Sequence, residues 1–232
     1  MGIFSGSYLT YVLPAILLSM LAQWLVTSTY ARWSKVRNHM QFTGADAAQR
    51  LLTYGGLHDV RVEAAPGKLS DHYDPRSRTL RLSASVAQSP SVAALAVTAH
   101  EIGHAMQDRQ GYLPLRLRSA LVPAVNLGSS LAWILIVIGF MLNNLQLATL
   151  GVAAFAVGAV FALATLPVEL NASARARTLL RESGLVQGAE EAGGVNAVLS
   201  AAAFTYVAAL AAAVLQLLYF TGLLGGIGGR RR

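Results

Sequence analysis

The chain has 232 residues, of which 54% are hydrophobic and only 12% are charged. Soluble domains carry about 25% charged residues, so this composition excludes an ordinary soluble protein and favours membrane spans. The absence of cysteine excludes disulfides and cysteine-bound zinc. The net charge of +7 comes from basic residues that flank apolar blocks. Such an arrangement is typical of residues that orient a protein in a membrane, rather than of nucleic-acid binding.

The first thirty residues carry no charge, and Tyr8 to Tyr30 is long enough to cross a bilayer. A cleaved signal peptide is the alternative, but no basic residue precedes the apolar run and no clear cleavage site ends it. We therefore predict a retained transmembrane anchor over residues 1–30. Arg32, Lys35 and Arg37 follow directly, and the positive-inside rule then places this end of the anchor in the cytoplasm.

Residues 31–118 differ in composition from the rest of the chain and contain all five histidines. Asp46 to Tyr54 is predicted as a short helix that ends at Gly55-Gly56. Val60 to Ala64 and Arg78 to Ser83 alternate in the manner of strands, with turn signals between them. These patterns together predict a small α+β domain.

A longer helix is predicted from about Pro90 to Arg109, with Ser89 as its N-cap. It contains His100-Glu101-Ile102-Gly103-His104, in which the two imidazoles lie one turn apart on one face. They can bind one Zn²⁺, while Glu101 can reach a water at the open position of the metal. From its composition, a chain of this kind would contain about 0.003 such motifs by chance. We therefore predict that residues 31–118 form a zincin-like catalytic domain with one zinc ion.

The second half of the chain contains three further apolar blocks. Residues 119–168 carry no charge and predict a transmembrane hairpin that turns at Asn143-Asn144. A cytoplasmic segment over 169–203 contains three arginines, and a last transmembrane helix and basic tail are predicted over 204–232. The fold class is thus a mainly α membrane protein with about four transmembrane helices and a small α+β domain at the membrane surface. Only the terminal Arg230–Arg232 cluster disagrees with this topology.

A catalytic zinc site needs three protein ligands and an open position. The metzincin pattern would place Gly at 107 and His at 110, where this chain has Gln107 and Gln110, so that class is excluded. Glu169 is the favoured third ligand, because a carboxylate that bounds an apolar span is costly and is by default a functional candidate. The other candidates for the third ligand are Asp108, His72, His58 and His39.

The sequence resembles the YugP-like family of neutral zinc metallopeptidases, which are membrane proteases. The resemblance rests on the His100–His104 motif, the Glu169 segment, Asp71-His72-Tyr73-Asp74-Pro75 and the layout of the spans. More distantly, Glu169-Leu170-Asn171-Ala172-Ser173 is similar to the Glu-x-x-Ala-Asp segment of gluzincin membrane proteases of the HtpX/Ste24 type. There the Glu binds zinc and the Asp supports a ligand. The resemblance implies that Glu169 binds zinc; because Ser173 replaces the Asp, Asn171 or another group is expected to orient the histidines.

The predicted reaction is peptide-bond hydrolysis, with zinc activating a water and Glu101 acting as the general base. The strand over Arg78–Ser83 is expected to offer an exposed edge to an extended substrate. With Glu169 as a ligand the site would lie close to the cytoplasmic membrane surface, so we expect membrane-bound or membrane-proximal polypeptides as substrates, at a bacterial cell membrane. The candidate oxyanion donors are Tyr73, His72 and Arg175.

Other classes of protein fit the sequence less well. An intramembrane site-2-type protease would place the motif within a span and draw an Asp from another span, but no apolar block here contains Asp. A non-catalytic zinc-binding membrane scaffold is the main alternative, although a purely structural zinc site has no need of Glu101. No motif indicates nucleic-acid binding, and none specifies an oligomeric state.

Overall fold

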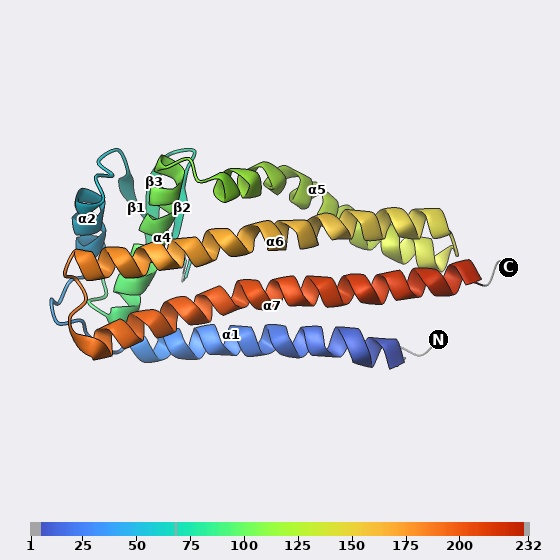
Figure 1. Cartoon of the computed structure of the whole chain (residues 1–232), viewed down its shortest axis with the longest axis horizontal. Helices are drawn as coiled ribbons and strands as arrows, with labels where there is room; N and C mark the ends of the chain where they lie inside the picture. The colour runs from blue at the N-terminus through green and yellow to red at the C-terminus, as the bar shows by residue number, and fades with distance from the viewer. Residues whose placement is uncertain (1–5, 68, 230–232) are drawn as a thin grey trace. The chain divides into compact units, whose positions relative to one another are not determined.

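The computed structural model describes residues 6–67 and 69–229, and the chain is mainly helical (Figure 1). The predicted basic tail Arg230–Arg232 and the first five residues of the predicted anchor lie outside the described residues. The chain divides into two compact units. Unit 1 comprises Met1–Gln23, Arg116–Pro167 and Thr205–Arg232, and unit 2 comprises Trp24–Leu115 and Val168–Phe204.

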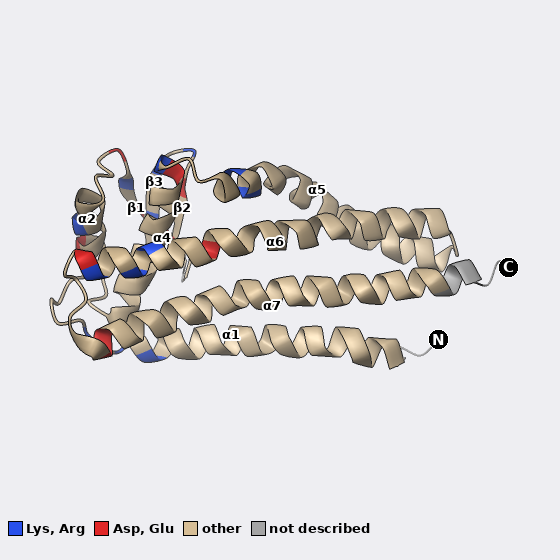
Figure 2. Cartoon of the chain, in the orientation of Figure 1, with Lys and Arg blue, Asp and Glu red and all other residues tan. Residues whose placement is uncertain are grey.

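Unit 1 consists of parts of four helices that are long and apolar enough to cross a membrane, as the sequence predicted. Arg116 and Arg118 are the only Asp, Glu, Lys or Arg residues in the described part of this unit, as the charge colouring in Figure 2 illustrates. A helix satisfies its own backbone hydrogen bonds, which is what a bilayer interior requires. The helices are η1 (Tyr8–Val12, a π-helical turn) followed by α1 (Leu13–Trp33), α5 (Leu113–Met141), α6 (Leu145–Glu182) and α7 (Gly188–Gly229).

Two of these helices extend further than their apolar stretches. α6 continues through Pro167 to Glu182, beyond the uncharged stretch over 119–168 that was predicted as a transmembrane hairpin. α7 begins at Gly188, whereas its apolar span was predicted from Phe204. The added turns are amphipathic and bury small and apolar side chains at helical spacing in unit 2, which stabilises them as helices. On α6 these buried residues are Ala176, Leu179 and Leu180.

Unit 2 contains the small mixed sheet and the shorter helices. The predicted first helix is α2, which carries a capping box between Thr43 and Asp46 and ends at Gly55. The two predicted strands are confirmed within one residue at each end, but a third strand of only three residues was not predicted, because it is too short to show an alternating pattern. The elements are α2 (Gly44–Tyr54), β1 (Arg61–Ala65), β2 (His72–Asp74), β3 (Thr79–Ser83), α3 (Ala84–Ala87) and α4 (Val92–Arg109).

The sheet has the strand order β1-β3-β2, with β1 parallel and β2 antiparallel to β3. The expectation that the Arg78–Ser83 strand offers an exposed edge is therefore wrong, since β3 is the central strand. Its side chains explain this position: Leu80 and Leu82 are buried in the core of unit 2, and Thr79 and Ser83 are buried as well. The free edges of the sheet belong to β1 and β2.

Helix α4 forms the centre of the core of unit 2. It begins at Val92, and the Oγ of Ser91 accepts a hydrogen bond from the backbone N–H of Ala94 at 3.2 Å. The predicted N-cap at Ser89 is therefore two residues too early. Most of α4 is buried against α2, the sheet and the unit 2 parts of α6 and α7, so its histidines are held on a rigid element.

Candidate metal centre

Three potential metal ligands from two helices meet in unit 2. His100 and His104 lie on α4 and Glu169 lies on α6, and one ligand atom of each falls within 4.8 Å of the other two. Oε2 of Glu169 lies 3.1 Å from Nε2 of His100 and 3.4 Å from Nε2 of His104. The two imidazole rings stand nearly perpendicular, at 85°. The three side chains therefore converge on one small volume.

The close approach of α4 and α6 depends on a glycine. α4 places His100 and His104 one turn apart, on the face that α6 covers. Between them is Gly103, where an added Cβ would lie 2.5 Å from the carbonyl oxygen of Ala172. A side chain at this position would push the two backbones apart. Glycine thus lets α6 bring Glu169, which is only 1% exposed, beside both histidines.

The Nδ1 atom of His104 is held by Gln107, which is fully buried one turn further along α4. Oε1 of Gln107 lies 3.0 Å from this Nδ1, and Nε2 of Gln107 donates to the carbonyl oxygen of Val168 at 2.8 Å and to Oδ1 of Asn171 at 3.0 Å. A backbone carbonyl can only accept, so the amide nitrogen of Gln107 must face Val168 and its oxygen must face His104. Nδ1 of His104 therefore carries a proton, and in the neutral ring the lone pair on Nε2 points to the cluster.

The two predicted supporting residues on α6 also lie beside the cluster. Oγ of Ser173 lies 3.2 Å from Nδ1 of His100, so this hydroxyl can orient the imidazole ring. Asn171 contacts the cluster only through Gln107, and its Oδ1 also accepts from Nε of Arg175 at 2.6 Å. No sequence pattern pointed to Gln107, whose presence only excluded the metzincin pattern.

Glu101 is held by the edge strand of the sheet. Its Oε2 accepts a hydrogen bond of 3.0 Å from the backbone N–H of Tyr73 on β2, the strand that pairs with β3 on its other side. Burial raises the pKa of the Glu101 carboxyl, although the neighbouring histidines oppose this effect. A general base works best when its pKa lies near the working pH, and the shift is in that direction.

The remaining candidates from the sequence lie elsewhere. The hydroxyl of Tyr73 donates to Asp108 at 2.9 Å, and burial and this hydrogen bond raise the pKa of Tyr73. The Tyr73 hydroxyl and the Asp108 carboxylate are thus hydrogen-bonded to each other rather than to the three potential ligands. The guanidinium of Arg175 lies over the ring of Tyr112. Among the described residues the other histidines also lie outside the cluster: His72 and His58 are exposed, and His39 contacts Glu191.

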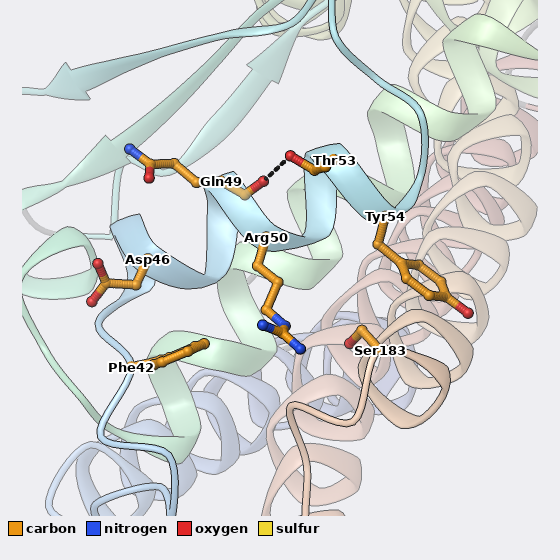
Figure 3. Close-up of a pocket in the computed structure, with 7 residues that line it drawn as sticks. All are labelled: Phe42, Asp46, Gln49, Arg50, Thr53, Tyr54 and Ser183. Carbon is orange, nitrogen blue, oxygen red and sulfur yellow. Dashed lines mark hydrogen bonds between the residues drawn. The ribbon is translucent and has the colours of Figure 1, made fainter.

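Unit 2 also contains a cavity that is separate from these three potential ligands. A cavity of about 710 Å³ lies between α2 and the turn that joins α6 to α7, and none of the three potential ligands lines it. Figure 3 shows its lining side chains, with Arg50 extending towards Ser183. The one carboxylate in this lining, that of Asp46, is hydrogen-bonded to Thr43 at the start of α2. This hollow therefore contributes nothing to metal binding.

The donor set of the cluster is compatible with a zinc ion. Tetrahedral zinc with bonds of about 2.0–2.1 Å separates neighbouring ligand atoms by about 3.3 Å. The separations between Glu169 and the two histidines are 3.1 and 3.4 Å. Two imidazole nitrogens and one carboxylate oxygen are also a donor set of catalytic zinc sites, and three protein ligands leave a fourth position open.

The sequence model of the family described as "Putative neutral zinc metallopeptidase" matches residues 8–225, which is most of the chain. The chain belongs to this family. It is also 43% identical over 213 residues to the protein named "Putative membrane protease YugP" of Bacillus subtilis (strain 168). That alignment covers 92% of this chain and 94% of the relative. No solved structure matches the chain.

Membership of the family confirms the resemblance to the YugP-like neutral zinc metallopeptidases. Together with the four candidate membrane helices, it supports a zinc metallopeptidase in a membrane. The family description indicates zinc, and the three converging side chains form a group that could hold a metal ion.

Proposed function

We propose that the protein is a membrane-embedded zinc endopeptidase in which His100, His104 and Glu169 hold one zinc ion per chain. The observation that carries this proposal is the convergence of these three ligands, with Glu101 beside them, in a member of a zinc metallopeptidase family. The catalytic role is assigned to Glu101 because it follows the first histidine directly and because its half-buried carboxylate interacts electrostatically with His100, His104 and Glu169.

The chemistry divides between the ion and the side chains around it. Bound zinc would supply a Lewis acid that lowers the pKa of a water and polarises the scissile carbonyl. Glu101 takes the proton from the attacking water and later delivers it to the leaving nitrogen. Gln107 and Ser173 hold the two imidazoles so that their Nε2 atoms face the cluster.

We propose that an extended substrate pairs with the outer edge of β2. This edge faces α4, because the Tyr73 N–H that points away from β3 is bound by Glu101. An incoming substrate carbonyl would compete for the same N–H, as a peptide does when it adds a strand to a sheet. Substrate binding would then release the Glu101 carboxylate for its reaction with water.

The proposed substrates are membrane-bound or membrane-proximal polypeptides, and the proposed side is the cytoplasm. Glu169 follows the uncharged stretch over 119–168 directly along the chain, so a site that uses it lies near the end of an apolar span. Cleavage of freely soluble proteins alone, with membrane-anchored versions of the same sequences left intact, would contradict this part of the proposal.

The test uses the full chain in liposomes with membrane-anchored peptide substrates. A Glu101→Gln variant should keep its zinc and lose activity by about 10²-fold or more, because it lacks the general base. Glu190→Gln, an exposed position on α7, is the matched control and should remain active. Zinc bound without hydrolysis by the unaltered chain would favour the non-catalytic scaffold, and full activity of Glu101→Gln would exclude Glu101 as the base.

A further inference from the structure

A second cavity of unit 2 combines two arginines with an apolar lining. It has a volume of about 440 Å³ and lies between the unit 2 parts of α6 and α7. Its polar lining includes Arg177 and Arg181 of α6 and Asn196 of α7, and its apolar lining includes Leu180, Val186 and Val195. No carboxylate lines it. The cavity is of the size that small-molecule sites commonly have.

Arg177 is fixed in place by neutral partners. Its Nε donates to Oδ1 of Asn196 at 2.9 Å, and its Nη2 donates to Oγ of Ser200 at 3.1 Å. These two acceptors lie one turn apart on α7, so they orient the guanidinium without compensating its charge. A guanidinium has five N–H donors, which leaves donors of Arg177 for a further acceptor.

The second arginine adds uncompensated charge on the same helix face. Arg181 lies one turn after Arg177, and two like charges at this spacing repel each other. Within the described residues no carboxylate forms an ion pair with either of them. The missing counter-charge points to an anion from outside the chain.

The acidic residues near the cavity in sequence do not provide this counter-charge. Glu182 and Glu190 are exposed and line no part of the cavity. Glu191 is buried, and its carboxylate accepts hydrogen bonds from the backbone N–H groups of His39 and Gln187. Its charge is therefore already used to hold the start of α7.

We propose that this cavity binds a phosphate group attached to an apolar molecule, with the phosphate between Arg177 and Arg181. Arginine presents paired donors that match the oxygens of a phosphate, and the apolar lining suits an attached non-polar group. The cavity lies on the turns of α6 and α7 that continue beyond their apolar, candidate membrane-spanning stretches, so an acidic phospholipid is the phosphate carrier that this chemistry fits best. The site is distinct from the proposed zinc centre, and its failure would leave the peptidase proposal intact.

The experiment measures lipid binding to the full chain in neutral detergent by native mass spectrometry. The probes are phosphatidylglycerol and a glucosyl diacylglycerol with the same acyl chains, which lacks phosphate. The unaltered chain should bind phosphatidylglycerol at least about tenfold more tightly, and Arg181→Gln should remove most of this preference. Arg181 makes no hydrogen bond to another described side chain, so the Arg181→Gln substitution leaves the fold intact. Arg177→Lys keeps the positive charge but loses the paired N–H donors of the guanidinium, and it should weaken phosphatidylglycerol binding less than Arg181→Gln does.

The matched control is the double variant Arg116→Gln/Arg118→Gln, which removes two arginines from the start of α5. It should keep the full preference for phosphatidylglycerol. Equal loss in the control and in Arg181→Gln, or no preference in the unaltered chain, would overturn the proposal. Competition with inorganic phosphate distinguishes a free phosphate ligand from a lipid headgroup. If millimolar phosphate displaces the lipid, the free anion is sufficient for binding at this site. If the lipid is retained, the attached apolar group is required for binding.

Discussion

At the scale of single residues, Gln107 connects the two helices that supply the ligands. Its side chain contacts His104 on α4 and both Val168 and Asn171 on α6, and every polar atom of its amide has a partner. Outer hydrogen bonds of this kind fix the orientation of a ligating imidazole and strengthen metal binding. Gln107 is therefore a positioning residue rather than a ligand.

A Gln107→Leu variant should lower zinc affinity by about 10–100-fold, because the Nδ1–H of His104 loses its acceptor. Competition with a chromophoric zinc chelator measures the affinity directly, without relying on activity. Gln110→Leu, an exposed change at the end of the same helix, should have no effect. An unchanged affinity in Gln107→Leu would show that His104 needs no support from this side chain.

Local spacing in the sequence is what made His100, Glu101 and His104 candidates for the site. His100, Glu101 and His104 lie on one helix, so their spacing in the sequence already determines on which face of that helix each side chain lies. Glu169 could be proposed because its charge ends an apolar stretch. Gln107 could not, because its role depends on a partner 61 residues away and on the direction of a buried amide.

At the scale of elements, the candidate site depends on how closely α4 and α6 approach each other. A Gly103→Ala variant should lower both the melting temperature and the zinc affinity, because the added Cβ meets the backbone of Ala172 and the helices must separate. Overpacking of this kind costs about 1–3 kcal/mol of the free energy of unfolding. Thermal unfolding and zinc competition measure the two effects.

Gly193→Ala on α7 is the control, because an added Cβ there meets nothing within 4 Å. Alanine in a helix interior is favoured over glycine, so this variant should be as stable as the unaltered chain or more stable. If Gly103→Ala behaved like Gly193→Ala, the close contact between α4 and α6 would not exist.

The elements themselves were predictable where they are long or strongly patterned. The four apolar helices, α2, α4 and two strands follow from composition and periodicity. β2 is too short for a pattern, and without it β3 was wrongly predicted as an edge strand. The continuation of α6 beyond Pro167 was not predicted, because proline and the polar residues after it are typical of a helix end. The continued helix is stabilised by the side chains that it buries in unit 2.

At the scale of the whole molecule, the topology in the membrane is a prediction from the positive-inside rule. The chain has no cysteine, so single cysteines can be introduced and labelled in intact cells with an impermeant maleimide. Gln49→Cys, exposed on α2, should be protected, and Leu142→Cys, exposed between α5 and α6, should be labelled. The reverse pattern would place the candidate site on the outer side of the membrane.

In the proposed site, a carboxylate on α6 completes the zinc-binding set that α4 begins. The most direct measurement is the zinc content and affinity of the purified full chain, beside Glu169→Ala and the control Glu182→Ala, an exposed position on the same helix. The unaltered protein and the control should each bind about one zinc per chain. Binding should be lost or much weaker in Glu169→Ala, and full zinc affinity in that variant would exclude Glu169 as a ligand.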